Sequence, residues 1–356
     1  MPLVSLEVHN VRIIDQFASP LHPLINVITG ANASGKTSFL EALYLLGTGK
    51  SFRAPQTEHI LRHTTEVLTV FGRYQDNIVG EVSLGIQRSA KTRRIKVGDT
   101  EQKNASALAQ TFPVQAISPD SYRAFLQEAG ARRALLNWGL FHVEPEFNAL
   151  WERYRRLLKQ RNAALRARQL AAIWDKELVQ VGEQIHELQT RYCARWGTAF
   201  QEYGAQLMGP VSVRLGFKQG WSEDSSLAEA LRRDHGRDTE RGITHSGPHR
   251  TDIQIQLEGQ ALRHFGSHGQ QKLIVIALKL AHAQQFMRHT QRYPAFLIDD
   301  LAAELDREHG RRLLNVLAQM RTQVFITAIE TQQIEAQAWN DYGLFHVEQG
   351  RLQRLK

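Results

Sequence analysis

Residues 30–37 have the types and spacing of a loop that cradles phosphate groups. They read Gly-Ala-Asn-Ala-Ser-Gly-Lys-Thr, and they lie between an apolar segment, 25–29, and a helical segment, 37–46. The glycines let the main chain wrap closely, so its N–H groups and the helix N-terminus can face phosphate oxygens. Lys36 would reach the β- and γ-phosphates, and the Thr37 hydroxyl would bind Mg²⁺. The ATP-binding candidates are Gly30, Ala31, Asn32, Ala33, Ser34, Gly35, Lys36, Thr37 and Ser38.

Two acidic residues follow the apolar segment Ala295–Ile298, which has the character of a buried strand. A phosphate-binding loop works with a carboxylate at the end of a nearby strand, which holds Mg²⁺. We therefore expect Asp299 to bind the metal together with Thr37. Asp300 would orient or deprotonate the attacking water, and Lys36 is the second catalytic candidate. The alternative is a strand that merely ends in two solvated acids.

The separation of these motifs indicates the class of nucleotide-binding protein. Asp299 comes 262 positions after Thr37, and the chain has no Asn-Lys-x-Asp guanine motif. A long insertion is typical of the ABC-type ATPase head, which carries a third element just before its acidic strand. Here residues 267–272 read Ser-His-Gly-Gln-Gln-Lys and open a predicted helix, whose N-terminus can bind phosphate. The candidates are Ser267, Gly269 and Gln270, and the alternative is an ordinary serine N-cap.

The composition narrows the choice of compartment and partner. The 356 residues carry a formal net charge of +8, which favours polyanionic partners only weakly. No apolar stretch approaches the roughly 18–20 residues of a membrane span, and the first residues do not resemble a secretory signal. Cys193 is the single cysteine, so neither an intrachain disulfide nor a cysteine metal cluster can form. We expect a cytoplasmic protein with no membrane partner.

The order of predicted elements indicates an α/β fold. Strand-like segments occur near both ends of the chain, whereas Leu, Ala, Arg, Gln and Glu dominate the segment 121–208. The sequence therefore predicts an ABC-type P-loop ATPase head, with a mixed sheet around the P-loop helix and an inserted, mainly helical second lobe. We expect residues 1–120 and 209–356 to form the ATPase lobe, and residues 121–208 the helical lobe.

With these motifs in this order, the chain resembles the RecF family of bacterial recombination and replication-repair ATPases, which is related to the heads of SMC proteins. The resemblance covers essentially the whole chain. It rests on segments 30–43, 49–53, 132–142, 157–163, 244–249 with Asp252, 267–272 and 298–306.

This resemblance implies a protein that binds ATP and Mg²⁺ and forms a homodimer on ATP. In such heads the segment that begins at Ser267 closes over the γ-phosphate of a second subunit. The resemblance further implies binding to single-stranded and gapped duplex DNA. It also implies cooperation with RecR and RecO in loading RecA and in the SOS response.

Three positions depart from the pattern of ABC heads. Asp300 stands where these heads usually carry Glu, Ala303 stands where they carry Ser, and residues 327–329 offer no His. Each departure removes or weakens a polar contact to the γ-phosphate or the water. We therefore expect slow, DNA-dependent hydrolysis that serves as a switch rather than a motor. A protein that binds ATP without turnover, and an ABC transport ATPase, are the competing hypotheses.

Basic residues supply further candidates. Arg155, Arg156, Lys159 and Arg161 crowd one predicted helix, and Arg93 and Arg94 lie near a predicted hairpin. Either cluster could contact DNA phosphates, or be a solvated charged face. Arg12 and Arg53 could each contact a nucleotide phosphate, or each could be a surface residue. Gln115 is a candidate sensor of Mg²⁺ or water, with 118–120 as the alternative.

Overall fold

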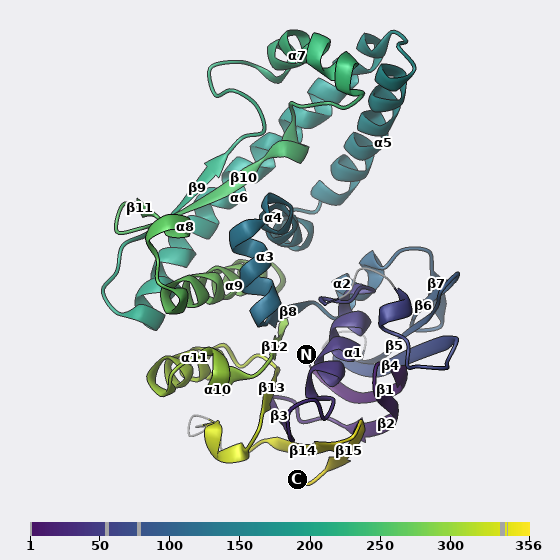
Figure 1. Ribbon diagram of the computed structural model, residues 1–356, viewed down its shortest axis with the longest axis vertical. Helices are drawn as coiled ribbons and strands as arrows, with labels where there is room; N and C mark the ends of the chain where they lie inside the picture. Colours follow the sequence, from purple (N-terminus) through teal and green to yellow (C-terminus); the bar gives the residue numbers. More distant parts are fainter. Residues whose placement is uncertain (1, 54–56, 77–79, 335–338, 340) are drawn as a thin grey trace. The chain divides into compact units, whose positions relative to one another are not determined.

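The computed structural model describes residues 2–53, 57–76, 80–334, 339 and 341–356, and its chain divides into two compact units (Figure 1). The first unit comprises Met1–Arg123 and Gln291–Lys356, and the second comprises Ala124–Thr290. The two ends of the chain therefore build one unit, as expected from the distribution of strands. None of the described helices is long and apolar enough to cross a membrane.

A six-stranded sheet in the first unit has the order β15-β14-β3-β13-β12-β8. Every residue of β3 (Ile25–Thr29), β13 (Val324–Ala328), β12 (Ala295–Ile298) and β8 (Val114–Ile117) is buried. These four strands run parallel, so their carboxyl ends meet at one edge. The phosphate loop follows β3 and the acidic pair follows β12, so the sheet brings both motifs to that edge.

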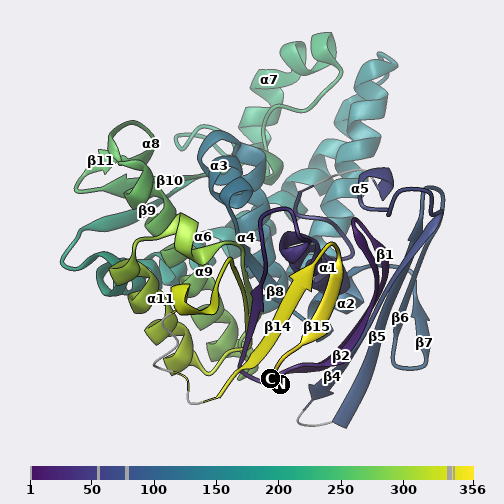
Figure 2. The same cartoon turned by 60° about the horizontal axis from the view of Figure 1, so that its bottom comes forward.

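The C-terminal hairpin extends this sheet. Strand β14 (Gly343–Glu348) runs parallel to β3. Strand β15 (Arg351–Arg354) pairs with β14 in the antiparallel direction (Figure 2). The turn of the hairpin reaches back to the phosphate loop, because the Gly350 N–H donates to the Ser34 carbonyl at 2.8 Å. The C-terminal hairpin therefore supports the loop.

A second, antiparallel sheet has the order β2-β1-β4-β5-β6-β7. Its strands are β1 (Leu3–Val11), β2 (Ile14–Pro20), β4 (Val67–Asp76), β5 (Gly80–Ser89), β6 (Arg93–Val97) and β7 (Thr100–Gln102). Helix α1 (Lys36–Thr48) contacts strands of both sheets. Side chains on several sides of α1 are therefore buried, and Phe39 lies edge-to-face against Phe17.

Three further helices lie around these sheets in the described part of the first unit. They are α2 (Ser106–Thr111), α10 (Leu301–Glu304) and α11 (Arg307–Met320). Helix α3 (Pro119–Gln127) runs across the division between the units. Single 3₁₀ turns occur at Thr57–His59, Ala171–Trp174, Pro248–Arg250 and Thr331–Gln333.

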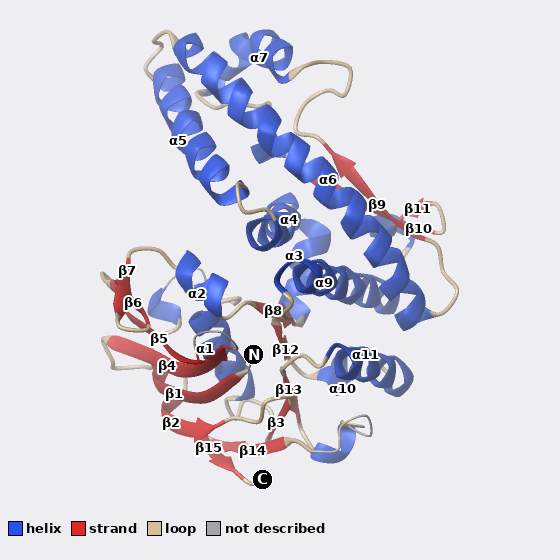
Figure 3. Ribbon diagram, turned by 180° about the vertical axis from the view of Figure 1, so that it is seen from behind, coloured by secondary structure: helices blue, strands red, loops and turns tan. Residues whose placement is uncertain are grey.

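The second unit is mainly helical (Figure 3). Its longest helix, α6 (Asp175–Met208), packs along α5 (Phe147–Arg166) and α9 (His268–Thr290). The other elements are α4 (Ala129–Val143), α7 (Leu227–Arg241), α8 (Leu262–Phe265) and the sheet of β9 (Val213–Lys218), β10 (Asp252–Leu257) and β11 (Gln260–Ala261).

The second unit differs from the expected helical lobe, which ended at residue 208. Residues 209–290 belong to it, although we expected them in the ATPase lobe. The physical reason is that the chain after α6 returns along that helix. Strand β9 packs on α6 and pairs with β10, and α9 packs on α6 as well. The strand-like segments between residues 209 and 290 therefore belong to a small sheet of the second unit.

The structure also corrects the expectation that Arg161 contacts DNA. The Arg161 side chain is fully buried. Its Nε donates to Asp175 at 2.7 Å, and Nη1 donates to Asp238 at 2.7 Å and to the Thr244 hydroxyl at 2.8 Å. The ion pairs join α5 to α6 and α7, so Arg161 holds the helices together and cannot reach a phosphate.

We predict that Arg161→Ala strongly destabilises the protein. The substitution would leave the carboxylate of Asp238, which is fully buried, without its cation, at a cost of about 3–5 kcal/mol. Arg155→Ala, on the exposed side of the same helix, is the control and should change stability by no more than about 0.5 kcal/mol. Urea denaturation measures both. Equal, small effects would contradict the structural role of Arg161.

Candidate nucleotide-binding site

The phosphate loop has the backbone geometry that its glycines permit. Gly30 and Gly35 have φ angles of +150° and +118°, which side chains rarely adopt. A Cβ on Gly30 would also lie 2.3 Å from the Val347 carbonyl oxygen. The loop therefore requires glycine at both positions, and α1 begins directly after it at Lys36.

The ammonium of Lys36 lies within the loop. Its Nζ donates to the carbonyl oxygens of Gly30 at 2.7 Å and Ala31 at 2.9 Å, and the residue is 8% exposed. The buried Ser34 hydroxyl has no hydrogen-bond partner among the described residues. A buried cation and a buried donor at the N-terminus of a helix together fit the oxygens of a polyphosphate.

Asp299 is held by hydroxyl groups from two elements. The Thr37 hydroxyl lies 3.0 Å from both carboxylate oxygens, and the Thr327 hydroxyl donates to one of them at 2.9 Å. Thr327 in turn accepts from the Asp300 N–H at 2.8 Å. The structure thus brings the two candidate metal ligands into contact across 262 residues of sequence.

The charge of Asp299 is incompletely balanced. Burial raises its pKa, while the hydrogen bonds from Thr327 and Thr37 and the charge of Arg53 oppose that rise. A buried carboxylate beside a threonine hydroxyl is a set of hard oxygen ligands, which Mg²⁺ prefers. The residues present therefore fit a divalent cation that would balance this charge.

Asp300 begins the segment that follows β12 and Asp299. Its φ angle of +52° lies in the left-handed region, which aspartate tolerates better than most residues. Helix α10 follows at once, and Asp306 caps α11 by accepting from the His309 N–H. The conformation of Asp300 sharply redirects the chain after β12.

Two buried polar groups near Asp299 lack a described hydrogen-bond partner and are candidates to bind a ligand or water. Gln115 lies on β8, opposite Phe296 of β12, and its Nε2 has no hydrogen-bond partner among the described residues. The Tyr122 hydroxyl is likewise unpartnered there; burial raises its pKa, helped by the charges of Glu304 and Asp299. Tyr122 is not predictable from the sequence, because its spacing from the motifs carries no signal.

Arg12 is engaged by a buried acid. Its Nε and Nη2 donate to the two carboxylate oxygens of Glu41 at 2.8 and 3.0 Å, and Glu41 is fully buried on α1. The Ser51 hydroxyl also donates to Glu41, and the Arg53 N–H donates to Ser51 at 3.0 Å. Glu41, which no sequence motif marks as a site residue, thus connects the two arginine-bearing loops beside the P-loop helix.

The segment that begins at Ser267 has the geometry of a capped helix terminus. The Ser267 hydroxyl accepts from the Gln270 N–H at 3.3 Å, and Gln270 accepts from the Ser267 N–H at 2.9 Å. Ser267, Gly269 and Gln270 are all exposed at the start of α9. The N-cap alternative is therefore realised in this structure, and the terminus presents polar groups to solvent.

The remaining basic candidates lie on two surfaces. Arg155, Arg156 and Lys159 are exposed on α5 and form no ion pair with any residue that the structure describes. They line a groove of about 600 Å³. Arg93 and Arg94 are exposed on β6, where the groove that Arg94 lines also contains Asp99 and Glu101.

Comparison with known proteins identifies the family. The family model "RecF/RecN/SMC N terminal domain" matches residues 2–353. A protein of Chromohalobacter salexigens named "DNA replication and repair protein RecF" is 38% identical over 99% of both chains. The chain belongs to the RecF family of DNA replication and repair proteins. A relative of the same name from Pseudomonas fluorescens is 36% identical over 99% of this chain and 98% of its own.

Solved structures agree with this membership of the RecF family. The fold matches a structure described as the recombination mediator RecF-ATP in the RecFOR pathway, with a TM-score of 0.88, 21% identity and coverage of 100% and 98% of the two chains. An Smc head bound to a domain of ScpA matches with a TM-score of 0.62, 14% identity and coverage of 100% and 97%. The predicted ABC-type head with a helical lobe is confirmed.

We predict that Asp299→Asn raises the melting temperature of the nucleotide-free protein at neutral pH. An acid whose pKa is raised by folding contributes stability at low pH that is lost as the pH rises through the folded-state pKa. The neutral amide avoids that loss. Calorimetry measures the effect, and Asp99→Asn, at an exposed aspartate, should leave the temperature unchanged.

The same variant should lose the further stabilisation that Mg²⁺ and ATP together give the wild type. A lower melting temperature without nucleotide, or an undiminished response to Mg²⁺ and ATP, would contradict the role assigned to Asp299.

Proposed function

We propose that this RecF-family protein is an ATP-dependent switch that binds DNA during recombinational repair and replication. The contact between Thr37 and Asp299 is the observation that carries the proposal. It joins the phosphate loop to a buried acid, which is the arrangement required to bind a nucleoside triphosphate together with Mg²⁺. The solved RecF structure with ATP in its description supports ATP as the nucleotide.

We infer that separate residues of the site bind the phosphates, hold the metal and orient the attacking water. Lys36 and the N–H groups of the loop and of Ser38 bind the phosphates, and Thr37 and Asp299 hold the metal. Mg²⁺, when bound, neutralises charge on the β- and γ-phosphates. Asp300 orients the attacking water or accepts its proton. Arg12, whose Nε and Nη2 donate to Glu41, would offer its Nη1 to the phosphates, and Arg53 would reach them from the neighbouring loop.

Slow turnover is part of this proposal. Asp300 is one methylene shorter than the Glu usual in ABC heads, and Thr327 uses its hydroxyl to hold Asp299 and Asp300. Ala303 offers no hydroxyl. With fewer polar contacts to the γ-phosphate and the water, hydrolysis acts as a timer that releases DNA rather than as a motor, and DNA stimulates it.

We infer that two copies enclose ATP. The exposed terminus at Ser267, Gly269 and Gln270 carries a helix dipole with no described acid in its first turn. That terminus suits the γ-phosphate bound to the phosphate loop of a second copy. ATP would then favour a homodimer, and hydrolysis would open it.

DNA would bind this dimer through exposed cations. We assign the main phosphate contacts to Arg155, Arg156 and Lys159, because their groove is lined by four cations and one acid, whereas the groove that Arg94 lines holds two cations and two acids. Single-stranded and gapped duplex DNA are the expected ligands. The RecFOR pathway, named for a solved neighbour, suggests RecR and RecO as partners in loading RecA and in the SOS response, in the cytoplasm.

We predict that wild-type protein sediments as a dimer with ATP and binds gapped DNA, whereas Lys36→Arg remains monomeric. A bulkier guanidinium cannot take the position of the buried ammonium between Gly30 and Ala31. Lys103→Arg, at an exposed lysine, is the matched control and should behave like wild type. A wild type that neither dimerises with ATP nor binds gapped DNA would contradict the proposed function.

We predict that replacing Arg155, Arg156 and Lys159 together by Gln flattens the salt dependence of DNA binding. Each lost phosphate contact lowers the slope of log K against log salt by about 0.9, so the slope should fall by about 2 to 3. Replacing Arg93 and Arg94 by Gln should change it little. The opposite ranking of the two variants would move the DNA contact to the β6 surface.

A further inference from the structure

One strand of the small sheet in the second unit has an open edge. Strand β10 pairs along its whole length with β9, but β11 pairs only with Gln256 and Leu257. The turn between β10 and β11 has positive φ angles at Glu258 and Gly259, as a two-residue hairpin of type I′ requires. The remaining length of β10 has no described strand on that side.

The hairpin fixes which main-chain groups face the open edge. In such a hairpin the residues that flank the turn, Leu257 and Gln260, exchange hydrogen bonds. Main-chain groups alternate in direction along a strand, so those of Ile253 and Ile255 also point away from β9. The Ile253 N–H is taken by the carboxylate of Asp252 at 2.9 Å. The Ile253 carbonyl and both main-chain groups of Ile255 remain.

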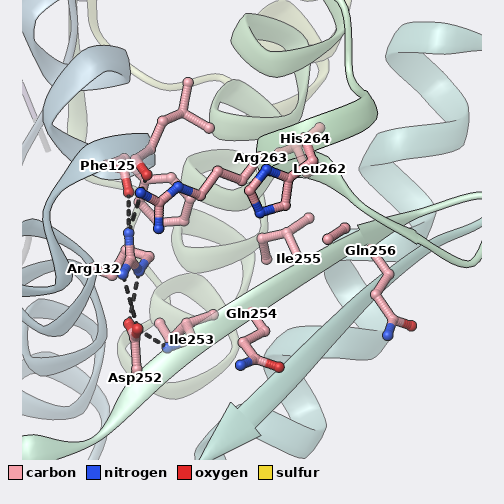
Figure 4. Close-up of a pocket in the computed structure, with 12 residues that line it drawn as sticks. Phe125, Arg132, Asp252, Ile253, Gln254, Ile255, Gln256, Leu262, Arg263 and His264 are labelled. Carbon is pink, nitrogen blue, oxygen red and sulfur yellow. Dashed lines mark hydrogen bonds and ion pairs between the residues drawn. The ribbon is translucent and has the colours of Figure 1, made fainter.

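A pocket of about 280 Å³ lies along this edge (Figure 4). Arg132 closes one end, because it binds Asp252 through two hydrogen bonds of 2.7 and 2.8 Å and the Phe125 carbonyl at 3.0 Å. Phe125 and Leu262 contribute buried apolar surface to the lining. The volume is near the lower limit of ligand pockets, which suits a few residues of an extended chain.

The available charge in the pocket is positive. Arg132 and Asp252 neutralise each other. Arg263 and His264 are exposed and pair with no acid among the residues that the structure describes. An acidic side chain would therefore be attracted to the part of the pocket lined by Arg263 and His264.

We propose that the open edge of β10 binds an extended acidic segment of a partner protein by adding it as a strand. A peptide can both donate to the Ile253 and Ile255 carbonyls and accept from the Ile255 N–H, which is how strand addition gains affinity. A nucleic-acid phosphate can only accept, so it would leave both carbonyls unpaired. The site also immediately precedes Ser267 in the chain, so an occupied pocket would sit beside the helix terminus that the proposed dimer uses.

The probe is a fluorescein-labelled octapeptide of alternating Glu and Val, added to the full-length protein and followed by fluorescence anisotropy. Arg263→Glu should weaken binding at least ten-fold, with an unchanged melting temperature. Arg214→Glu, at an exposed arginine of β9 on the same sheet, should bind like wild type. The corresponding Lys and Val peptide should bind at least ten-fold more weakly.

Two measurements distinguish strand addition from simple charge attraction. Hydrogen exchange of the Ile255 amide should slow at least ten-fold with peptide. Methylating the odd-numbered or the even-numbered peptide nitrogens should abolish binding for one pattern only. Equal binding of both patterns, unchanged exchange at Ile255, or displacement by an eight-nucleotide oligothymidylate would each overturn the proposal.

Discussion

The hydrogen bonds between Asp299 and the two threonines Thr37 and Thr327 are the constraint on which the candidate site depends. They join the start of α1, the end of β12 and the end of β13. Every strand that carries these groups is buried, so the sheet cannot shift one group without the others. A carboxylate placed in this way keeps an excess of negative charge, which a divalent cation would balance.

A second network performs a corresponding task in the helical unit. Arg161 bridges two acids, and the segment after α7 bonds to α5, because Thr244 pairs with Asn162 and His249 pairs with Tyr154. Burial lowers the pKa of His249 to about 4, so this contact is made by a neutral ring at physiological pH. Segment 244–249, one of those that resemble the RecF family, therefore has a structural role, because it holds the chain after α7 against α5.

Local patterns predicted the parts of the site that depend on local geometry. The glycine spacing of the phosphate loop and the acids after Ile298 can be recognised in the sequence, because each motif directly adjoins the strand or helix that positions it. The sequence could not show that Arg161 is buried, since a helix carrying many arginines has no mark of which one faces acids from α6 and α7. The boundary at residue 208 failed for a similar reason, because β9 and α9 return to α6 through non-local contacts. Tyr122 and Glu41 also depend on such contacts.

We propose that ATP and DNA favour the same ATP-bound dimer, so each must strengthen the binding of the other. The most direct test titrates gapped DNA with and without a slowly hydrolysed ATP analogue, and titrates the analogue with and without the same DNA. Both affinities should rise by one common factor, as thermodynamic linkage requires, and this factor should exceed about five. A DNA affinity that the analogue leaves unchanged, at a concentration that saturates the phosphate loop, would rule out this coupling.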